Sequence, residues 1–165
     1  TNRTAGVTKA RVGGMGRPRT ALACAKVDRI EVKRLGEPCQ FTTLDGQERK
    51  VDENTLMICA KGEPVGIAGI MGGLDSEIED DTDSLLLESA NFDAVSVRKS
   101  STRLGLRTDA SMRYEKTLDP EMCPTAIARF VKLLLDIDPQ AQVISRLTDV
   151  YCKKYPQVSL RFDKA

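Results

Sequence analysis

The segment of residues 66–120 constrains the fold most strongly, because its apolar runs are cut by residues that a packed core does not need. One apolar run ends at the glycine pair Gly72-Gly73, and a run of leucines ends at Glu88. Glycine lets another backbone or a ligand approach closely, and a glutamate is rarely buried without a partner. This order of turns and isolated acids favours a binding site over a segment that only packs a core.

Strands are predicted by short extended runs that alternate with turn residues. Asp45-Gly46 lies between two such runs, and Asp-Gly is a strong signal for a tight hairpin. Residues 61–63 form a short turn between two apolar runs. Besides the two arms of the hairpin, the strands that we expect are residues 30–35, 55–60, 64–70, 84–87, 143–151 and 158–162.

A first helix is predicted by its two end signals. Asp93 is expected to cap a helix that continues through Leu104 and stops at Gly105. Residues 106–114, which follow it, are expected to be extended or irregular.

A second helix is predicted to start at Asp119-Pro120 and to extend to about Asp136. Its apolar residues recur at helical spacing, so we expect core positions at Cys123, Ile127, Phe130 and Leu134. Many strands with helices late in the chain indicate an α+β fold. We expect mixed or antiparallel sheets in a sandwich-like arrangement, with two or three helices at one side.

The chain of 165 residues contains no histidine, which excludes a Ser-His-Asp triad, a Cys-His dyad and a histidine-ligated metal. Its five cysteines are widely spaced and form no C-x-x-C pair, so a zinc site or a disulfide framework is not expected. Reduced thiols fit a cytoplasmic protein. No apolar run approaches the roughly 18 residues that a membrane span needs, and no membrane contact is expected.

Charge divides the chain into two unequal parts. Residues 1–34 carry a net charge of +7, and residues 35–165 carry a net charge of −6. Residues 1–25 follow neither a helical nor a strand period, so we expect an atypical basic arm in a loop conformation. Such an arm either contacts nucleic acid or is a solvated terminus. We expect the folded domain at residues 26–150 and a lead into a following domain at residues 151–165.

Four segments resemble, in order and spacing, the editing domain of the β subunit of bacterial-type phenylalanyl-tRNA synthetase (phenylalanine–tRNA ligase). They are VGIAGIMGG at 65–73, LESANFD at 87–93, RLGLRTDAS at 103–111 and RYEKTLDP at 113–120. The resemblance covers about residues 26–150. It implies that the chain is an internal piece of a much longer subunit.

The resemblance implies proofreading, in which tyrosine wrongly esterified to the phenylalanine tRNA is hydrolysed so that aminoacylation stays accurate. A phenylalanine pocket cannot strongly reject a ligand that merely adds a hydroxyl. Its discrimination against tyrosine reaches a factor of roughly 10² at best. A second pocket that hydrogen-bonds this hydroxyl refuses phenylalanine by factors of about 10⁴ or more, because phenylalanine leaves the buried acceptor unpaired.

Four residues match positions of the family's pocket. Glu88 matches the carboxylate that accepts a hydrogen bond from the tyrosine hydroxyl. Gly72 matches a pocket glycine, and the backbone N–H groups near Gly72 and Gly73 are oxyanion candidates, while no catalytic side chain is assigned. Thr108 and Ala110 match small wall residues, and Thr108 can donate a hydrogen bond. Each residue also has a purely structural interpretation, as a strand-end acid, a glycine turn or ordinary loop packing.

Three arginines, Arg103, Arg107 and Arg113, either face tRNA phosphates or pair with acids. The partners implied by the resemblance are tRNA(Phe) with its aminoacylated end, the synthetase α subunit and the remaining β-subunit domains. No cofactor is expected in this domain, and ATP and Mg belong to the whole enzyme.

One segment departs from the family pattern. The family carries a histidine upstream of the first strand, whereas the best local match here is GRPRTALA at 16–23, with Thr20 at the histidine position. We therefore expect weak or no editing by this chain alone, with hydrolysis resting on a positioned water, backbone N–H groups and a ribose hydroxyl of the tRNA end. The alternative function is a non-catalytic tRNA-binding or structural module that keeps the fold with an incomplete pocket.

Overall fold

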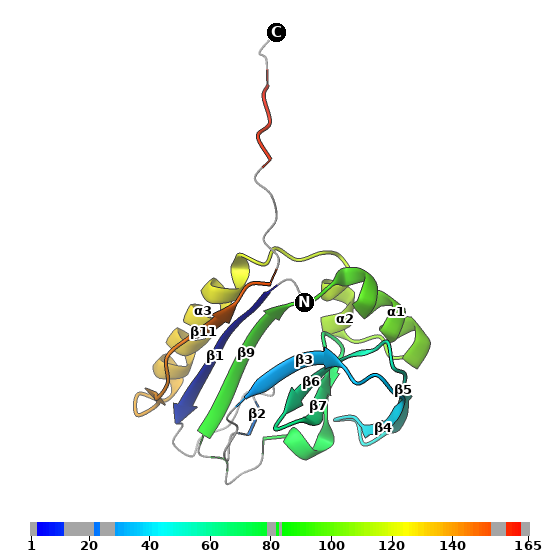
Figure 1. The fold of residues 1–165 in the computed structure, drawn as a ribbon. Coiled ribbons are helices and arrows are strands. Elements are labelled where there is room, and N and C mark those ends of the chain that lie inside the picture. Colours follow the sequence, from blue (N-terminus) through cyan, green and yellow to red (C-terminus); the bar gives the residue numbers. More distant parts are fainter. Residues whose placement is uncertain are drawn as a thin grey trace.

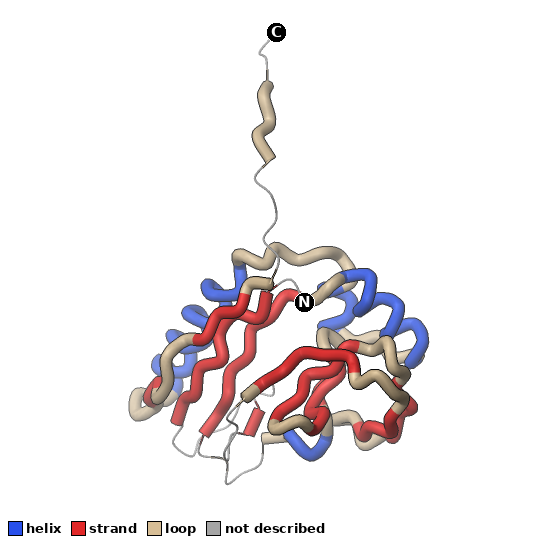
Figure 2. Tube along the Cα trace, in the orientation of Figure 1, coloured by secondary structure: helices blue, strands red, loops and turns tan. Residues whose placement is uncertain are grey.

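Two antiparallel sheets and a separate hairpin form the framework, with helices along its outer sides (Figures 1 and 2). The computed structural model describes residues 3–11, 22–23, 29–78, 82, 84–152 and 158–162. Every strand pair in this part of the chain is antiparallel. The α+β class that the sequence indicates is confirmed.

The first sheet is built around β9 (Ser84–Asn91). Strand β1 (Arg3–Arg11) pairs along one edge of β9, and β2 (Leu22–Ala23) pairs along the other. Strands β10 (Gln142–Val143) and β11 (Thr148–Val150) pair with the outer edge of β1. We expected Glu88 at the end of this strand. Strand β9 continues three residues beyond it, so Glu88 lies within the strand.

The expectation of a loop throughout residues 1–25 is wrong for residues 3–11 and 22–23, which are strands. The strand pattern is not visible locally, because β1 takes its regularity from pairing with β9 on one side and with β11 on the other. Such pairing depends on residues far away in the sequence. The other residues of 1–25 lie outside the described part, and the domain limits stay an expectation.

The second sheet confirms most of the strands expected between residues 30 and 70. The turn at residues 61–63 joins two antiparallel neighbours, and the chain turns back at residues 68–70, so the strand expected over 64–70 is shorter. In sheet order the strands are β3 (Ile30–Arg34), β6 (Leu56–Ala60), β7 (Glu63–Ile67) and β8 (Met71–Gly72).

The hairpin predicted at Asp45-Gly46 is confirmed. It consists of β4 (Cys39–Thr42) and β5 (Glu48–Val51). Beyond the end of β4, Thr43 forms a bridge with Gly73, so the hairpin is attached to the chain just after β8. Gly73, which is 30 residues after Thr43 in the sequence, is thereby held against the hairpin turn.

Helix α1 (Ala94–Leu104) is confirmed with both of its predicted ends. The Asp93 carboxylate accepts a hydrogen bond from the backbone N–H of Ser96 over 2.8 Å. Gly105 has a φ of 60°, the left-handed conformation that commonly ends a helix.

Helix α2 (Asp109–Tyr114) corrects the expectation that residues 106–114 are extended or irregular. Its N-cap is Thr108, whose hydroxyl accepts from the N–H of Ser111 while the Ser111 hydroxyl accepts from the N–H of Thr108. This reciprocal pair is a capping box with serine at the third position. The usual glutamate or glutamine is absent there, so the sequence signal was weak.

Helix α3 (Met122–Ile137) begins after the Asp119-Pro120 signal. The Asp119 carboxylate accepts from the N–H of Glu121 in the turn before the helix. The helix packs against β1 and β9 (Figure 1). Of the four expected core positions, Cys123 and Ile127 are buried, whereas Phe130 and Leu134 are half-buried.

The strand expected at residues 158–162 is not formed, and its apolar side chains at Val158, Leu160 and Phe162 are exposed. A short 3-10 turn, η1 (Leu74–Ser76), follows β8. Among the described residues, no helix is long and apolar enough to cross a membrane.

The main core lies between the second sheet, the hairpin and helices α1 and α2. Its buried members are Phe41, Val51, Met57, Cys59, Ile67, Ala68, Ile70, Ala90, Phe92, Val97 and Leu106. Ala90 and Phe92 come from β9 and the residues after it, so this core reaches the first sheet close to Glu88.

Candidate functional site

Glu88 is a half-buried acid with one buried, unused acceptor atom. Its Oε1 atom is inaccessible to solvent and has no hydrogen-bond partner among the described residues. Leaving such an oxygen unpaired costs free energy, because its contact with water is lost and not replaced. Burial also raises the pKa of Glu88 to about 7. The side chain is therefore an acceptor that a ligand hydroxyl could satisfy.

The strand beside Glu88 is irregular at the same level. In the pairing of β1 with β9, Ala5 faces Ser89 and Thr8 faces Leu87. Two residues of β1 therefore stand opposite the single residue Glu88, which is the arrangement of a β-bulge. Bulges are frequent beside functional sites, where they alter the direction of side chains.

Tyr114, the last residue of α2, lies against the same part of β9. Its hydroxyl donates to the carbonyl oxygen of Ala90 over 2.9 Å, and its ring centroid lies 5.2 Å from that of Phe92. Burial, followed by the negative charge of Glu88, raises the pKa of Tyr114 to about 12. Tyr114 is thus close enough to Glu88 for the two groups to interact electrostatically. We had not singled out Tyr114, although it is one of only three tyrosines in an aromatic-poor chain.

The other end of α2 is attached to the turn that precedes β8. The Thr108 hydroxyl donates to the carbonyl oxygen of Ile70 over 2.7 Å. Its single proton is therefore already used, and the expected donation from Thr108 to a ligand would require this bond to break. Ala110 lies half-buried in the first turn of α2.

Gly69 explains why this turn can approach α2 so closely. It has a φ of 68°, and a Cβ atom there would lie 3.2 Å from Tyr114 Cγ and 3.1 Å from Val97 Cγ2. Any larger residue would separate the turn from α1 and α2. The two ends of α2 therefore link Ile70, two residues before Gly72, with Ala90, two residues after Glu88.

Gly72 and Gly73 are held by the hairpin and by β7. The carbonyl oxygen of Gly72 accepts from the N–H of Leu44 over 3.1 Å, and the N–H of Gly73 donates to the carbonyl oxygen of Val65 over 2.8 Å. A Cβ atom on Gly73 would lie 2.6 Å from Phe41 Cζ. Packing alone therefore requires glycine at residue 73. Its N–H is also occupied, so it is not free for an oxyanion, and the assignment of Gly72 stays a prediction.

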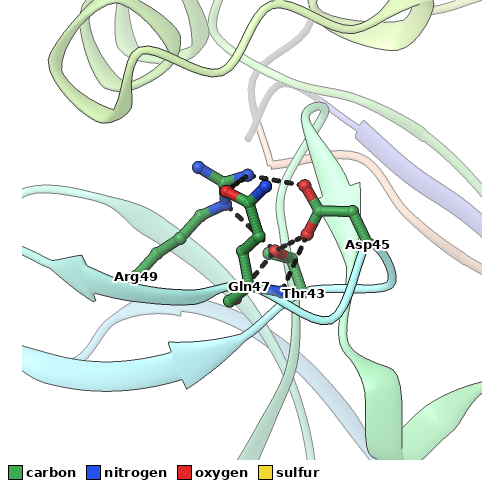
Figure 3. Close-up of polar contacts among 4 residues, drawn as sticks. All are labelled: Thr43, Asp45, Gln47 and Arg49. Carbon is green, nitrogen blue, oxygen red and sulfur yellow. Dashed lines mark hydrogen bonds and ion pairs between the residues drawn. The ribbon is translucent and has the colours of Figure 1, made fainter.

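The hairpin turn that carries Leu44 is stabilised by a compact polar cluster (Figure 3). The buried Thr43 hydroxyl donates to Asp45 Oδ1 over 2.5 Å and accepts from Arg49 Nε over 3.0 Å. Arg49 Nη2 donates to Asp45 Oδ2 over 2.6 Å. The hydrogen bond from Thr43 and the contact with Arg49 hold the pKa of Asp45 below its usual value. This cluster orders the turn on which Gly72 rests.

The three arginines that we considered for tRNA contact differ in their surroundings. Arg103 forms an ion pair with Asp52, and Arg107 Nη2 lies 3.2 Å from Glu115 Oε1. Arg113 Nη1 lies 3.5 Å from the carbonyl oxygen of Asp109 in the same helix. All three are exposed. Pairing with acids is thus observed for two of them, and a contact with tRNA stays a prediction.

Within the described ranges, no group of three or more cysteine, aspartate or glutamate side chains lies close enough to hold a metal ion. Glu88 Oε1 is the one buried side-chain N or O atom of the described residues that lacks a hydrogen-bond partner.

Comparisons with known proteins agree with the resemblance seen in the sequence. Curated relatives include the phenylalanine–tRNA ligase β subunit of Porphyromonas gingivalis, 43% identical over 146 residues, which are 87% of this chain and 18% of the relative. That of Clostridium acetobutylicum is 43% identical over 124 residues, 75% of this chain and 16% of the relative. That of Syntrophus aciditrophicus is 48% identical over 109 residues, 66% of this chain and 14% of the relative.

The chain thus spans less than a fifth of the length of these relatives. The similarity to phenylalanine–tRNA ligase β subunits is confirmed along most of the chain. A family model described as the B3/4 domain matches residues 11–139. The chain belongs to the B3/4 domain family.

Proposed function

We propose that this domain is the proofreading domain of a phenylalanine–tRNA ligase β subunit, and that it hydrolyses tyrosine esterified to tRNA(Phe). The observation that carries the proposal is the buried, unpartnered Oε1 atom of Glu88. A tyrosine hydroxyl supplies the donor that this oxygen lacks, whereas phenylalanine leaves it unpaired. Discrimination by an unpaired buried acceptor reaches factors of about 10⁴ or more.

The protonation state of Glu88 decides how strongly it accepts. With a pKa of about 7, the carboxyl is partly protonated near neutral pH when the pocket is empty. A phenol that donates to the carboxylate favours the ionised form, so binding of tyrosine lowers this pKa. Tyrosine binding is therefore accompanied by proton release below about pH 7, and the preference for tyrosine strengthens as the pH rises through that value.

The remaining parts of the proposed pocket come from residues linked through α2. Ala110 and Gly72 would line the tyrosine ring, with the flexible Leu44 side chain moving away from Gly72, and Thr108 holds the turn at Ile70 in place. Tyr114, the last residue of α2, lies close enough to Glu88 for the charge of that carboxylate to contribute to its raised pKa. A large side chain at residue 110 should block the ring without disturbing Glu88.

The proposed hydrolysis proceeds without a histidine, since the chain has none. Water attacks the ester carbonyl carbon, and the bond between that carbon and the ribose oxygen breaks. The ribose oxygen takes up the proton that the water loses, which yields free tyrosine and an intact tRNA end. A neighbouring ribose hydroxyl and the backbone at Gly72 are the candidates for orienting the water and for binding the oxyanion.

The histidine that the family carries upstream is replaced by Thr20, which lies outside the described residues. We therefore keep the expectation that this chain alone turns over slowly. In the cell, we propose, it works in the cytoplasm with the synthetase α subunit, the other β-subunit domains and tRNA(Phe). Aminoacylation with ATP and Mg would take place elsewhere in that enzyme.

The test separates recognition from turnover. Binding of L-tyrosine and L-phenylalanine to the 165-residue chain is measured by calorimetry at pH 8, and deacylation of tyrosyl-tRNA(Phe) is measured in parallel. We expect tighter binding of tyrosine, and we expect Glu88→Ala to abolish the preference. The exposed Glu48→Gln variant is the matched control and should keep it.

Equal binding of the two amino acids by the unaltered chain would contradict the proposal. A tyrosine preference without any deacylation would instead favour the alternative, a non-catalytic tRNA-binding module with an incomplete pocket. Two described groups support that alternative, because the N–H of Gly73 and the hydroxyl of Thr108 are already engaged.

A further inference from the structure

The outer face of α1 carries an open, positively charged hollow of about 440 Å³. Its lining residues are Arg98, Lys99, Thr102 and Arg103. They occupy two adjacent pairs about one helical turn apart, so they form a single patch about 7.5 Å long along the helix axis. No aromatic or aliphatic side chain of the described residues lines it.

The charge of this hollow is only partly neutralised. Helix α1 contains three basic residues and no acidic one. Arg103 is ion-paired with Asp52, which holds its guanidinium at the edge of the hollow. Arg98 and Lys99 are exposed, and neither pairs with an acid in the part of the chain that the structure describes. Two cationic groups are thus available to an anion.

Helix α1 lies between the hollow on its exposed face and the turn at Gly69 on its buried face. On the buried side of α1, Val97 contacts the same turn at Gly69 that Tyr114 touches. Helix α1 also follows β9 directly, with Asp93 as its cap. Because α1 begins six residues after Glu88, an RNA end that reaches Glu88 would have α1 near it.

We propose that Arg98, Lys99, Thr102 and Arg103 form a docking surface for the phosphate backbone of the tRNA end whose esterified amino acid enters the pocket. Arginine, lysine and threonine side chains are common partners of phosphate oxygens. The choice of RNA rests on the proposed function. It is favoured over an acidic peptide because the described lining has no tryptophan or tyrosine, and these two residues are enriched, with arginine, among the residues that dominate protein interfaces.

The absence of aromatic side chains from the hollow has a further consequence. Without a ring on which bases could stack and without a groove that reads base edges, the surface binds the backbone independently of sequence. It would orient the tRNA end and leave the selection between tyrosine and phenylalanine to Glu88.

The test measures binding of uncharged tRNA(Phe) to the chain by fluorescence anisotropy over a series of salt concentrations. The double variant Arg98→Gln/Lys99→Gln is compared with Arg129→Gln/Lys132→Gln on α3, which removes the same charge from another exposed surface. The plot of the logarithm of the association constant against the logarithm of the salt concentration has a negative slope. If both α1 residues contact phosphates, this slope should become shallower by about 1.4 in the α1 variant. We expect at least a tenfold weaker Kd at low salt for that variant and little change for the α3 control.

Equal losses in the two double variants would overturn the proposal, because they would show a general charge effect. An unchanged Kd in the α1 variant would overturn it as well. A weaker Kd for an acidic peptide in the α1 variant, with an unchanged Kd for tRNA, would also overturn it. Thermal unfolding of both variants checks that the exposed substitutions leave the fold intact.

Failure of this proposal can be told apart from failure of the proofreading function. The α1 variant should retain the preference for free L-tyrosine, since Glu88 is unchanged. Loss of tRNA affinity with no tyrosine preference in any variant would support the docking surface and refute the proofreading pocket.

Discussion

The hydroxyl of Tyr114 donates to the carbonyl oxygen of Ala90 over 2.9 Å, two residues along β9 from Glu88. Residues two apart on a strand face the same side of the sheet. The Tyr114 hydroxyl therefore donates its hydrogen bond to the backbone. It does not donate to Glu88 Oε1, which keeps no hydrogen-bond partner among the described residues.

Tyr114→Phe should lower the free energy of unfolding by about 1 kcal/mol, because the Ala90 carbonyl loses its side-chain donor while the ring packing is kept. Urea unfolding at pH 7 measures the change. A larger loss of about 3 kcal/mol or more would indicate that the hydroxyl supports further contacts. Near-UV circular dichroism checks that the ring remains packed against Phe92.

Glu88→Gln should remove a pH dependence of stability. The pKa of Glu88 is raised to about 7 in the folded chain from 4.5. Between these values the unfolded chain releases a proton that the folded chain keeps, so stability falls as the pH rises from about 4.5 to about 7. The full cost above pH 7 is about 3 kcal/mol.

Unfolding by urea at pH 4, 6 and 8 tests this linkage. The Glu88→Gln variant should gain stability relative to the unaltered chain at pH 8, and the gain should vanish at pH 4. The exposed Glu48→Gln variant is the control and should follow the unaltered chain. An identical pH profile for Glu88→Gln and the unaltered chain would contradict a buried, unpartnered carboxyl.

Thr108→Val should destabilise the chain by about 2 kcal/mol. The change removes both the N-cap of α2 and the hydrogen bond to Ile70, and each contributes about 1 kcal/mol. Thr125→Val, an exposed position on α3, should cost much less. Equal losses in the two variants, measured by thermal unfolding, would mean that Thr108 does not hold the turn.

Gly73→Ala should be more damaging than Gly72→Ala. At residue 73 a Cβ atom would lie 2.6 Å from Phe41 Cζ and 3.0 Å from the Val65 carbonyl oxygen, whereas at residue 72 its nearest neighbour is the flexible Leu44 side chain at 3.1 Å. Overpacking of this kind typically costs about 1–3 kcal/mol. If Gly72→Ala unfolds at the lower urea concentration, Phe41 and the Val65 carbonyl do not limit the space at residue 73 as we infer.

Gly72→Ala also tests the proposed pocket. If Gly72 provides a close backbone approach for the ligand, the variant should weaken tyrosine binding while its stability stays close to that of the unaltered chain. Gly66→Ala is a suitable comparison, since its Cβ atom would meet neighbours only at 3.5 Å or more.

Elements that depend on residues close together in the chain were predicted well. The Asp45-Gly46 hairpin and the helix from Asp93 to Gly105 were confirmed because a turn or a cap is decided within a few residues. Helix α2 was missed, since its capping box uses serine and its six residues are too few for a periodic pattern. Strand β1 was missed because it is stabilised by pairing with β9 and β11.

The candidate site shows the same division. Glu88, Gly72, Thr108 and Ala110 were selected by resemblance, but nothing local indicated that Glu88 Oε1 is inaccessible to solvent and unpaired. Tyr114 was overlooked, since its relation to Ala90 joins residues 24 apart in the sequence. The hollow on α1 was foreseen only in Arg103, because the positions of exposed cations depend on which acids fold beside them.

The sequence by itself determined the turns, the helix ends, the absence of histidine chemistry and the order of the segments that resemble the editing domain. These properties rest on local backbone preferences and on composition. Only the tertiary structure decided that Glu88 lies within β9 with an unpaired oxygen and that the Tyr114 hydroxyl donates to the carbonyl oxygen of Ala90. Burial and hydrogen-bond satisfaction depend on distant segments meeting in space, and no local pattern records that meeting.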